Sequence, residues 1–85
     1  MKAKKISVRV LARHIKKGVR GSFHYCPIAR ALRENGHKRI SVSVKSSFDG
    51  KAYRFVDALT AGMFMVDFDK GLSVSPFTVR FREAN

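Results

Sequence analysis

Hydrophobic and polar residues alternate in three stretches of the chain, residues 6–10, 39–48 and 77–82, and this period of two predicts three β-strands. A fourth strand is predicted over residues 51–56, where the chain returns from the hairpin turn signalled by Asp49-Gly50. Successive side chains of a strand point to opposite faces of its sheet. We therefore expect a sheet with one apolar face and one polar face.

A first helix is predicted between the first two strands. Pro27 suits the first turn of a helix, because the N–H that proline lacks has no partner there in any case. Ile28 and Leu32 are one helical turn apart and share a face. Asn35-Gly36 ends the helix after about nine or ten residues, since glycine adopts the left-handed conformation freely.

A second helix is favoured over residues 59–69, although a period of two also fits this segment. In a helix, Leu59, Met63 and Val66 share one face, and Phe64 and Phe68 lie opposite them. Exposed aromatic rings one turn apart indicate a partner surface, such as a homodimer interface. The alternatives are that the segment is partly extended or that a loop covers the rings.

The predicted order of elements is β-α-β-β-α-β. It predicts an α+β fold, in which a four-stranded antiparallel sheet carries two helices on one face, and the ferredoxin-like arrangement is one fold with this order. The 85 residues are expected to form a single small domain. Residues 1–5 are expected to be flexible, and residues 12–17 to form one helical turn or a short loop.

A two-residue turn at 49–50 fixes the register of the predicted hairpin. The pairs are then Phe48 with Lys51, Ser46 with Tyr53, and Val44 with Phe55. The apolar face carries Ile40, Val42, Val44, Tyr53 and Phe55. The opposite face carries Ser41, Ser43, Lys45, Ala52, Arg54 and Val56, and the outer strands add Ser7, Arg9, Thr78, Arg80 and Arg82 to it.

The positive charge is concentrated in the first half of the chain. The net charge is +12, and residues 1–45 hold 13 Lys and Arg but only one acid, Glu34. Residues 46–85 hold five of each and are neutral. A basic half beside a neutral half favours a polyanionic partner, although charge of this kind also improves solubility.

Candidate binding residues follow from the charge and the register. Arg, Lys, Ser and Thr are the side chains that contact phosphate oxygens, and a polar sheet face of this kind also suits solvent. The sheet-face candidates are Arg9, Lys45, Arg54, Arg80 and Arg82. The candidates that add positive charge nearby are Lys16, Lys17, Arg20, Arg30 and Arg33.

Candidates for catalysis or metal binding are few. Cys26 stands where a helix would begin, which lowers the pKa of a thiol, and His24 is two residues away. No acid or amide is placed to orient the histidine, and an unpaired Cys is more often a small buried residue. Together with His37 these residues provide at most three metal ligands, fewer than structural zinc requires. We expect no enzyme, no metal and no cofactor.

A single Cys and the lack of an apolar run long enough to span a bilayer favour a cytoplasmic protein.

Residues 51–56 (KAYRFV) resemble the aromatic strand motif of RNA-recognition motif domains. The predicted register turns Tyr53 and Phe55 toward the core, however, whereas stacking on bases requires exposed rings.

A longer resemblance covers most of the chain. Its residues are His14-Ile15-x-x-Gly18, Cys26-Pro27-Ile28-Ala29-x-Ala31-Leu32, Phe68-Asp69-x-Gly71 and Pro76-Phe77-x-Val79-x-Phe81. This combination resembles a group of short accessory proteins of tailed phages and prophages. The resemblance implies a phage protein of unassigned activity and supplies no catalytic residues.

Two functions are compatible with these features. The first is a non-enzymatic phage or prophage accessory protein that binds nucleic acid, or a nucleoprotein complex, through a basic surface. The alternative is an inhibitor, of anti-CRISPR or anti-restriction type, whose basic face docks on an acidic host enzyme or defence complex.

Overall fold

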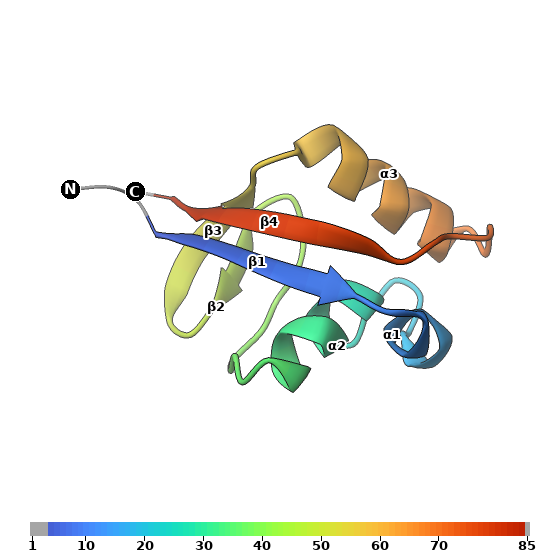
Figure 1. Cartoon of the computed structure of the whole chain (residues 1–85), viewed down its shortest axis with the longest axis horizontal. Helices are drawn as coiled ribbons and strands as arrows, with labels where there is room; N and C mark the ends of the chain where they lie inside the picture. Colours follow the sequence, from blue (N-terminus) through green and yellow to red (C-terminus); the bar gives the residue numbers. More distant parts are fainter. Residues whose placement is uncertain (1–3, 85) are drawn as a thin grey trace.

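The computed structural model describes residues 4–84 and contains four strands and three helices within them (Figure 1). In chain order they are β1 (Lys5–Val10), α1 (Ala12–Lys17), α2 (Pro27–Glu34), β2 (Ser46–Phe48), β3 (Lys51–Phe55), α3 (Ala58–Asp69) and β4 (Phe77–Glu83). None of these helices is long and apolar enough to cross a membrane.

The four strands form one antiparallel sheet in the order β1-β4-β3-β2. The predicted α+β fold with a four-stranded antiparallel sheet is therefore confirmed. The ferredoxin-like arrangement places the first strand inside the sheet, whereas β1 is an edge strand here, so that option is not the one adopted. α1 is a third helix in addition to the two predicted, at the segment for which a helical turn or a loop was expected.

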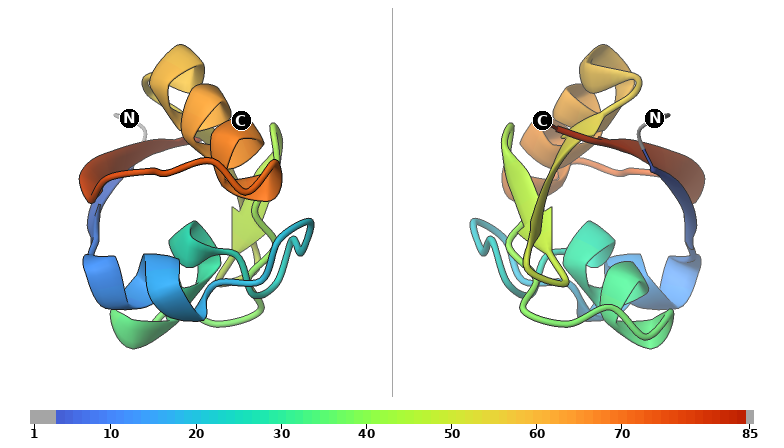
Figure 2. Two further views of the ribbon diagram at one scale, coloured as in Figure 1. Left: turned by 90° about the vertical axis from the view of Figure 1, so that its right-hand side faces the viewer. Right: turned by 90° about the vertical axis from the view of Figure 1, so that its left-hand side faces the viewer.

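The core lies on the concave side of the sheet. Seen end-on in Figure 2, the sheet curves, with β1 and β2 on opposite sides and α2 between them. α2 contributes Ile28 and Leu32 to this core, and α3, which follows β3 and runs beside β4, contributes Ala61 and Phe64. Both long helices thus bury their apolar faces against the same side of the sheet, and the other side is left uncovered.

The N-terminal part of the sheet begins earlier than predicted. Residues 1–3 of the segment expected to be flexible lie outside the described residues. Lys5, in contrast, is the first residue of β1, and the carbonyl of Lys4 accepts a 2.8 Å hydrogen bond from the N–H of Glu83. Pairing with β4 satisfies the backbone of these two residues, so the sheet begins within the segment for which flexibility was expected.

The predicted hairpin register is confirmed at the turn and wrong beyond it. Ser46 pairs with Tyr53 as expected, but β2 has three residues and Val44 is 84% exposed. The Oγ of Ser46 donates to the carbonyl of Ser43 at 2.9 Å, and that of Ser43 donates to the carbonyl of Lys45 at 2.9 Å. Such local bonds compete with strand pairing, so the chain bends at residues 43–45 and Val44 turns outward.

The helical prediction for residues 59–69 is confirmed, but its exposed and buried faces are reversed. Phe64 and Phe68 are buried, whereas Leu59, Met63 and Val66 are exposed. The cause is the ring of Phe77 at the start of β4, whose centroid lies 4.4 Å from that of Phe64. Burying the larger aromatic side chains removes more apolar surface from water. The predicted homodimer surface through Phe64 and Phe68 is therefore wrong, because neither ring is accessible.

Candidate nucleic-acid interface

The outer face of the sheet brings together four of the five predicted sheet-face residues. Arg9 lies on β1, Arg54 on β3, and Arg80 and Arg82 on β4, and all four are exposed. They share this face because the core residues between them, such as Val79, point to the other side of the same strands. We call the set Lys5, Arg9, Arg54, Arg80 and Arg82 the basic sheet face.

Three cations of the basic sheet face stand in one row across three strands. Lys5 pairs with Arg82 across β1 and β4, and Arg82 pairs with Arg54 across β4 and β3. Directly opposed residues have Cβ atoms roughly 5 Å apart, and like charges there are destabilising. Lys5 was not among the predicted residues, although the alternation of Ser7 and Arg9 extends back to it and could have identified it.

The basic sheet face has no counter-ion of its own in the part of the chain that the structure describes. The ion pairs there involve other residues: Arg13 and His14 with Glu34, His37 with Asp49, and Lys51 with Glu83. Glu83 belongs to the opposite face of β4, where it pairs across the strands with Tyr53. The cations of the row are thus available to an external anion.

Polar and apolar groups lie between the cations. Ser7 pairs with Arg80, and Thr78 pairs with Arg9 and accepts a 3.3 Å hydrogen bond from its guanidinium. Lys5, Ser7 and Arg80 also border a shallow hollow of about 300 Å³, with Val56 and Phe81 among its other lining residues. The face therefore combines side chains of the types that contact phosphate with a hollow beside them.

The remaining predicted cations lie elsewhere. Lys45 is in the bend before β2 and is not on the basic sheet face. Lys17, Arg30 and Arg33 line a cleft of about 280 Å³ between α1 and α2, together with Arg13, His14 and Glu34. Lys16 is exposed on α1, and Arg20 lies against the turn at Gly71. The sequence therefore predicted a single positive surface where the structure has two separate ones.

Glu34 is the one acid in the cleft between α1 and α2, and its neighbours neutralise it. Two nitrogens of Arg13 donate to its two oxygens, and His14 Nε2 lies 2.5 Å from Oε2. These hydrogen bonds, chiefly that from Arg13, lower the pKa of Glu34 from 4.5 to about 2. The backbone N–H of Leu11 donates to His14 Nδ1, so the proton of a neutral ring is on Nε2, toward Glu34.

Cys26 lies at the start of α2 and contributes to capping that helix. It is the N-cap of α2, where its Sγ accepts a hydrogen bond of 3.4 Å from the N–H of Ala29. Burial raises the pKa of this thiol, which opposes formation of the thiolate that a nucleophile requires. Nδ1 of His24 is hydrogen-bonded to the carbonyl of Ile40 at 2.8 Å.

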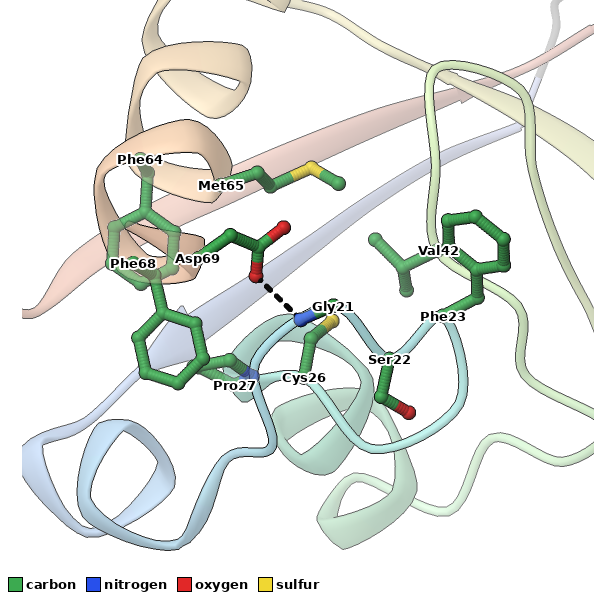
Figure 3. Close-up of a pocket in the computed structure, with 10 residues that line it drawn as sticks. All are labelled: Gly21, Ser22, Phe23, Cys26, Pro27, Val42, Phe64, Met65, Phe68 and Asp69. Carbon is green, nitrogen blue, oxygen red and sulfur yellow. Dashed lines mark hydrogen bonds between the residues drawn. The ribbon is translucent and has the colours of Figure 1, made fainter. Parts of the chain in front are cut away.

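The space beside Cys26 is small. It lies between the end of α3 and the loop before α2, and it holds about 30 Å³ (Figure 3), enough for about one water molecule. Phe64 and Phe68 close it on one side, and the N–H of Gly21 donates to Asp69 across it at 2.8 Å. Over residues 4–84, no group of three or more His, Cys, Asp or Glu side chains is arranged to hold a metal ion.

The aromatic strand motif of β3 is directed inward. Tyr53 is 1% exposed, and its ring stacks on that of Phe48 with 4.0 Å between centroids. No base can reach this ring, as the register predicted.

Comparison with known proteins gives no further assignment. No family model, curated protein or solved structure matches the chain. The resemblance to short phage accessory proteins remains a prediction.

Proposed function

We propose that the protein is a non-enzymatic nucleic-acid-binding protein and that the basic sheet face is its binding surface. The cations of this face contact phosphates, and binding is largely independent of base sequence, because phosphate contacts carry no sequence information. A role as an accessory protein of a phage or prophage would be consistent with this activity.

The row of Lys5, Arg82 and Arg54 is the observation that carries the proposal. Three directly opposed cations without an acid repel one another in the free protein. A negatively charged strand placed over the row removes this repulsion and releases its own counter-ions to solvent. If these cations served only to keep the protein in solution, cations spaced apart or alternated with acids would give the same solubility.

The proposal is tested by measuring affinity for a short duplex of arbitrary sequence by fluorescence anisotropy. We expect the double variant Arg54→Gln/Arg82→Gln to bind at least about tenfold more weakly at moderate salt, since two phosphate contacts are lost. The matched control is Lys38→Gln/Lys70→Gln, which removes the same charge from a loop and from the end of α3. Equal losses in the two double variants would show that only net charge matters and would contradict the proposed surface.

A protein partner with an acidic surface is the competing explanation for the same face. It predicts tight binding to one protein and weak binding to all nucleic acids. If the wild-type protein binds neither duplex nor single-stranded nucleic acid at low salt, the proposed function is wrong.

A further inference from the structure

An exposed aromatic ring lies beside the cleft between α1 and α2. Tyr25 is 51% exposed, and the guanidinium carbons of two arginines of α2 lie near its ring. They are 5.0 Å from the ring centroid for Arg33 and 5.9 Å for Arg30. Both arginines also line the cleft, so the ring and the cleft belong to one site.

Hydrogen bonds hold the main chain around this ring in place. The carbonyl of Tyr25 accepts a 2.8 Å hydrogen bond from the N–H of Val19, and its N–H donates to Ser22 Oγ at 3.0 Å. The next residue, Cys26, begins α2, and Nη2 of Arg33 donates to the carbonyl of His24 at 3.0 Å. The main chain that carries the ring and the guanidinium of Arg33 are therefore held in place before any ligand arrives, which lowers the entropy cost of binding.

The cleft has more positive charge than its own acid can balance. Glu34 is engaged by Arg13 and His14, and this leaves three cations for a ligand: Lys17, Arg30 and Arg33. None of the three forms an ion pair with an acid of residues 4–84.

The three cations indicate which chemical group the cleft would take. Cations without an acid partner favour a ligand group with several oxygens and negative charge, such as phosphate. Arginine and lysine side chains are the groups that contact phosphate oxygens.

We propose that this site binds one nucleotide unit of a single strand, with the phosphate in the cleft and the base stacked on Tyr25 or on the guanidinium plane beside it. The inference extends the proposed function, since it adds a stacking site for unpaired bases to a sheet face that binds phosphates. Aromatic rings and arginine planes are the groups on which single-stranded bases stack. A paired base is not accessible to such a ring, so duplex binding does not use this site.

The first test is an NMR titration of the whole protein with adenosine 5′-monophosphate, with inorganic phosphate and adenosine as separate arms. We expect chemical-shift changes at residues 17, 25, 30 and 33, with the monophosphate binding more tightly than either of its parts. Equal affinities for the monophosphate and inorganic phosphate would exclude a contribution of the base and overturn the inference. Chemical-shift changes that are confined to residues outside the cleft would overturn the inference as well.

The second test asks whether the site also binds a nucleotide that is part of a strand. It uses a single-stranded oligonucleotide of about ten residues. Tyr25→Leu should weaken its binding roughly tenfold and leave duplex binding unchanged, whereas Tyr25→Phe should retain wild-type affinity for both. Arg30→Gln should weaken single-strand binding, and Lys16→Gln on the neighbouring surface of α1 is the charge control. If Tyr25→Leu binds the single strand with wild-type affinity, no base of the strand stacks on Tyr25 and the inference is overturned.

The outcomes of the two proposals are distinguishable. Loss of duplex binding in Arg54→Gln/Arg82→Gln concerns the basic sheet face alone, and loss of single-strand binding in Tyr25→Leu concerns the cleft alone. If Arg54→Gln/Arg82→Gln binds duplex like the wild type and Tyr25→Leu binds the single strand more weakly, the proposed function of the basic sheet face fails and the nucleotide site stands.

Discussion

Two side chains secure the ends of α2, the helix that carries the cleft arginines. Cys26 caps its first turn through its sulfur, and Glu34, its last residue, holds α1 through Arg13 and His14. His14 is 4% exposed, so this contact joins a buried ring to a charged carboxylate. The position of Arg30 and Arg33 relative to Lys17 therefore depends on Glu34 remaining ionised.

The depressed pKa of Glu34 predicts how stability changes in acid. Its pKa is about 2 in the folded protein, against an ordinary value of 4.5. The carboxylate contributes stability that is fully present above about pH 4.5 and is lost as the pH falls toward 2. We expect Glu34→Gln to have a lower Tm than the wild type at pH 7, and the difference to shrink between pH 5 and 2.

Thermal denaturation across this pH range measures the effect, and NMR titration of the Glu34 carboxyl group measures its cause. Arg13→Gln is the control, because losing the main hydrogen-bond donor should return the Glu34 pKa toward its ordinary value. A difference in Tm between the wild type and Glu34→Gln that stays constant down to pH 2 would contradict the proposed role of Glu34.

At the scale of elements, the sequence predicted what local patterns determine. Alternation identified the strands, the 49–50 turn gave the pairing of Ser46 with Tyr53, and Pro27 marked the start of α2. The bend before β2 was missed, because Ser43 and Ser46 form side-chain bonds that alternation does not encode. The buried face of α3 was also missed, since it is selected by Phe77, a residue far away in the sequence that packs on Phe64.

The bend before β2 makes a testable distinction between two valines that alternation treats alike. Val42 is fully buried, and Val44 is 84% exposed. Val42→Ala should destabilise the protein by about 2 kcal/mol through lost burial and a cavity, whereas Val44→Ala should change the free energy of unfolding by less than about 0.5 kcal/mol. Urea denaturation of the two variants measures both values. Similar losses would indicate that the strand continues through residue 44 as the sequence predicted.

The row of opposed cations predicts that removing one of them stabilises the fold. The substitution Arg82→Thr replaces the cation between Lys5 and Arg54 with a neutral residue that favours β-strands. We expect the free energy of unfolding to rise by about 0.5 kcal/mol at low salt and the gain to shrink as salt is added. Arg82→Lys, which retains the charge, and Ala52→Thr, which changes strand propensity on the same face, are the controls. A loss of stability in Arg82→Thr would show that the row is not a site of repulsion.

Over the whole molecule, the sequence predicted positive charge but not its division between two surfaces. Composition placed the excess in residues 1–45, while the basic sheet face draws Arg54, Arg80 and Arg82 from the neutral half. Which cations lie together depends on the pairing of β4 with both β1 and β3, and this long-range pairing is not visible in local patterns. The cleft was missed for a related reason, because Arg13 and Lys17 come beside Arg30 only when α1 packs on α2.

The salt dependence of duplex binding tests the central claim most directly. The logarithm of the binding constant should fall linearly with the logarithm of the salt concentration, by about 0.9 for each phosphate contacted. The slope of the Arg54→Gln/Arg82→Gln variant should be shallower than that of the wild type by about 2, because each lost phosphate contact reduces it by about 1. The Lys38→Gln/Lys70→Gln control should keep the wild-type slope. Equal slopes for the wild type and the Arg54→Gln/Arg82→Gln variant would contradict the assignment of the basic sheet face as the nucleic-acid interface.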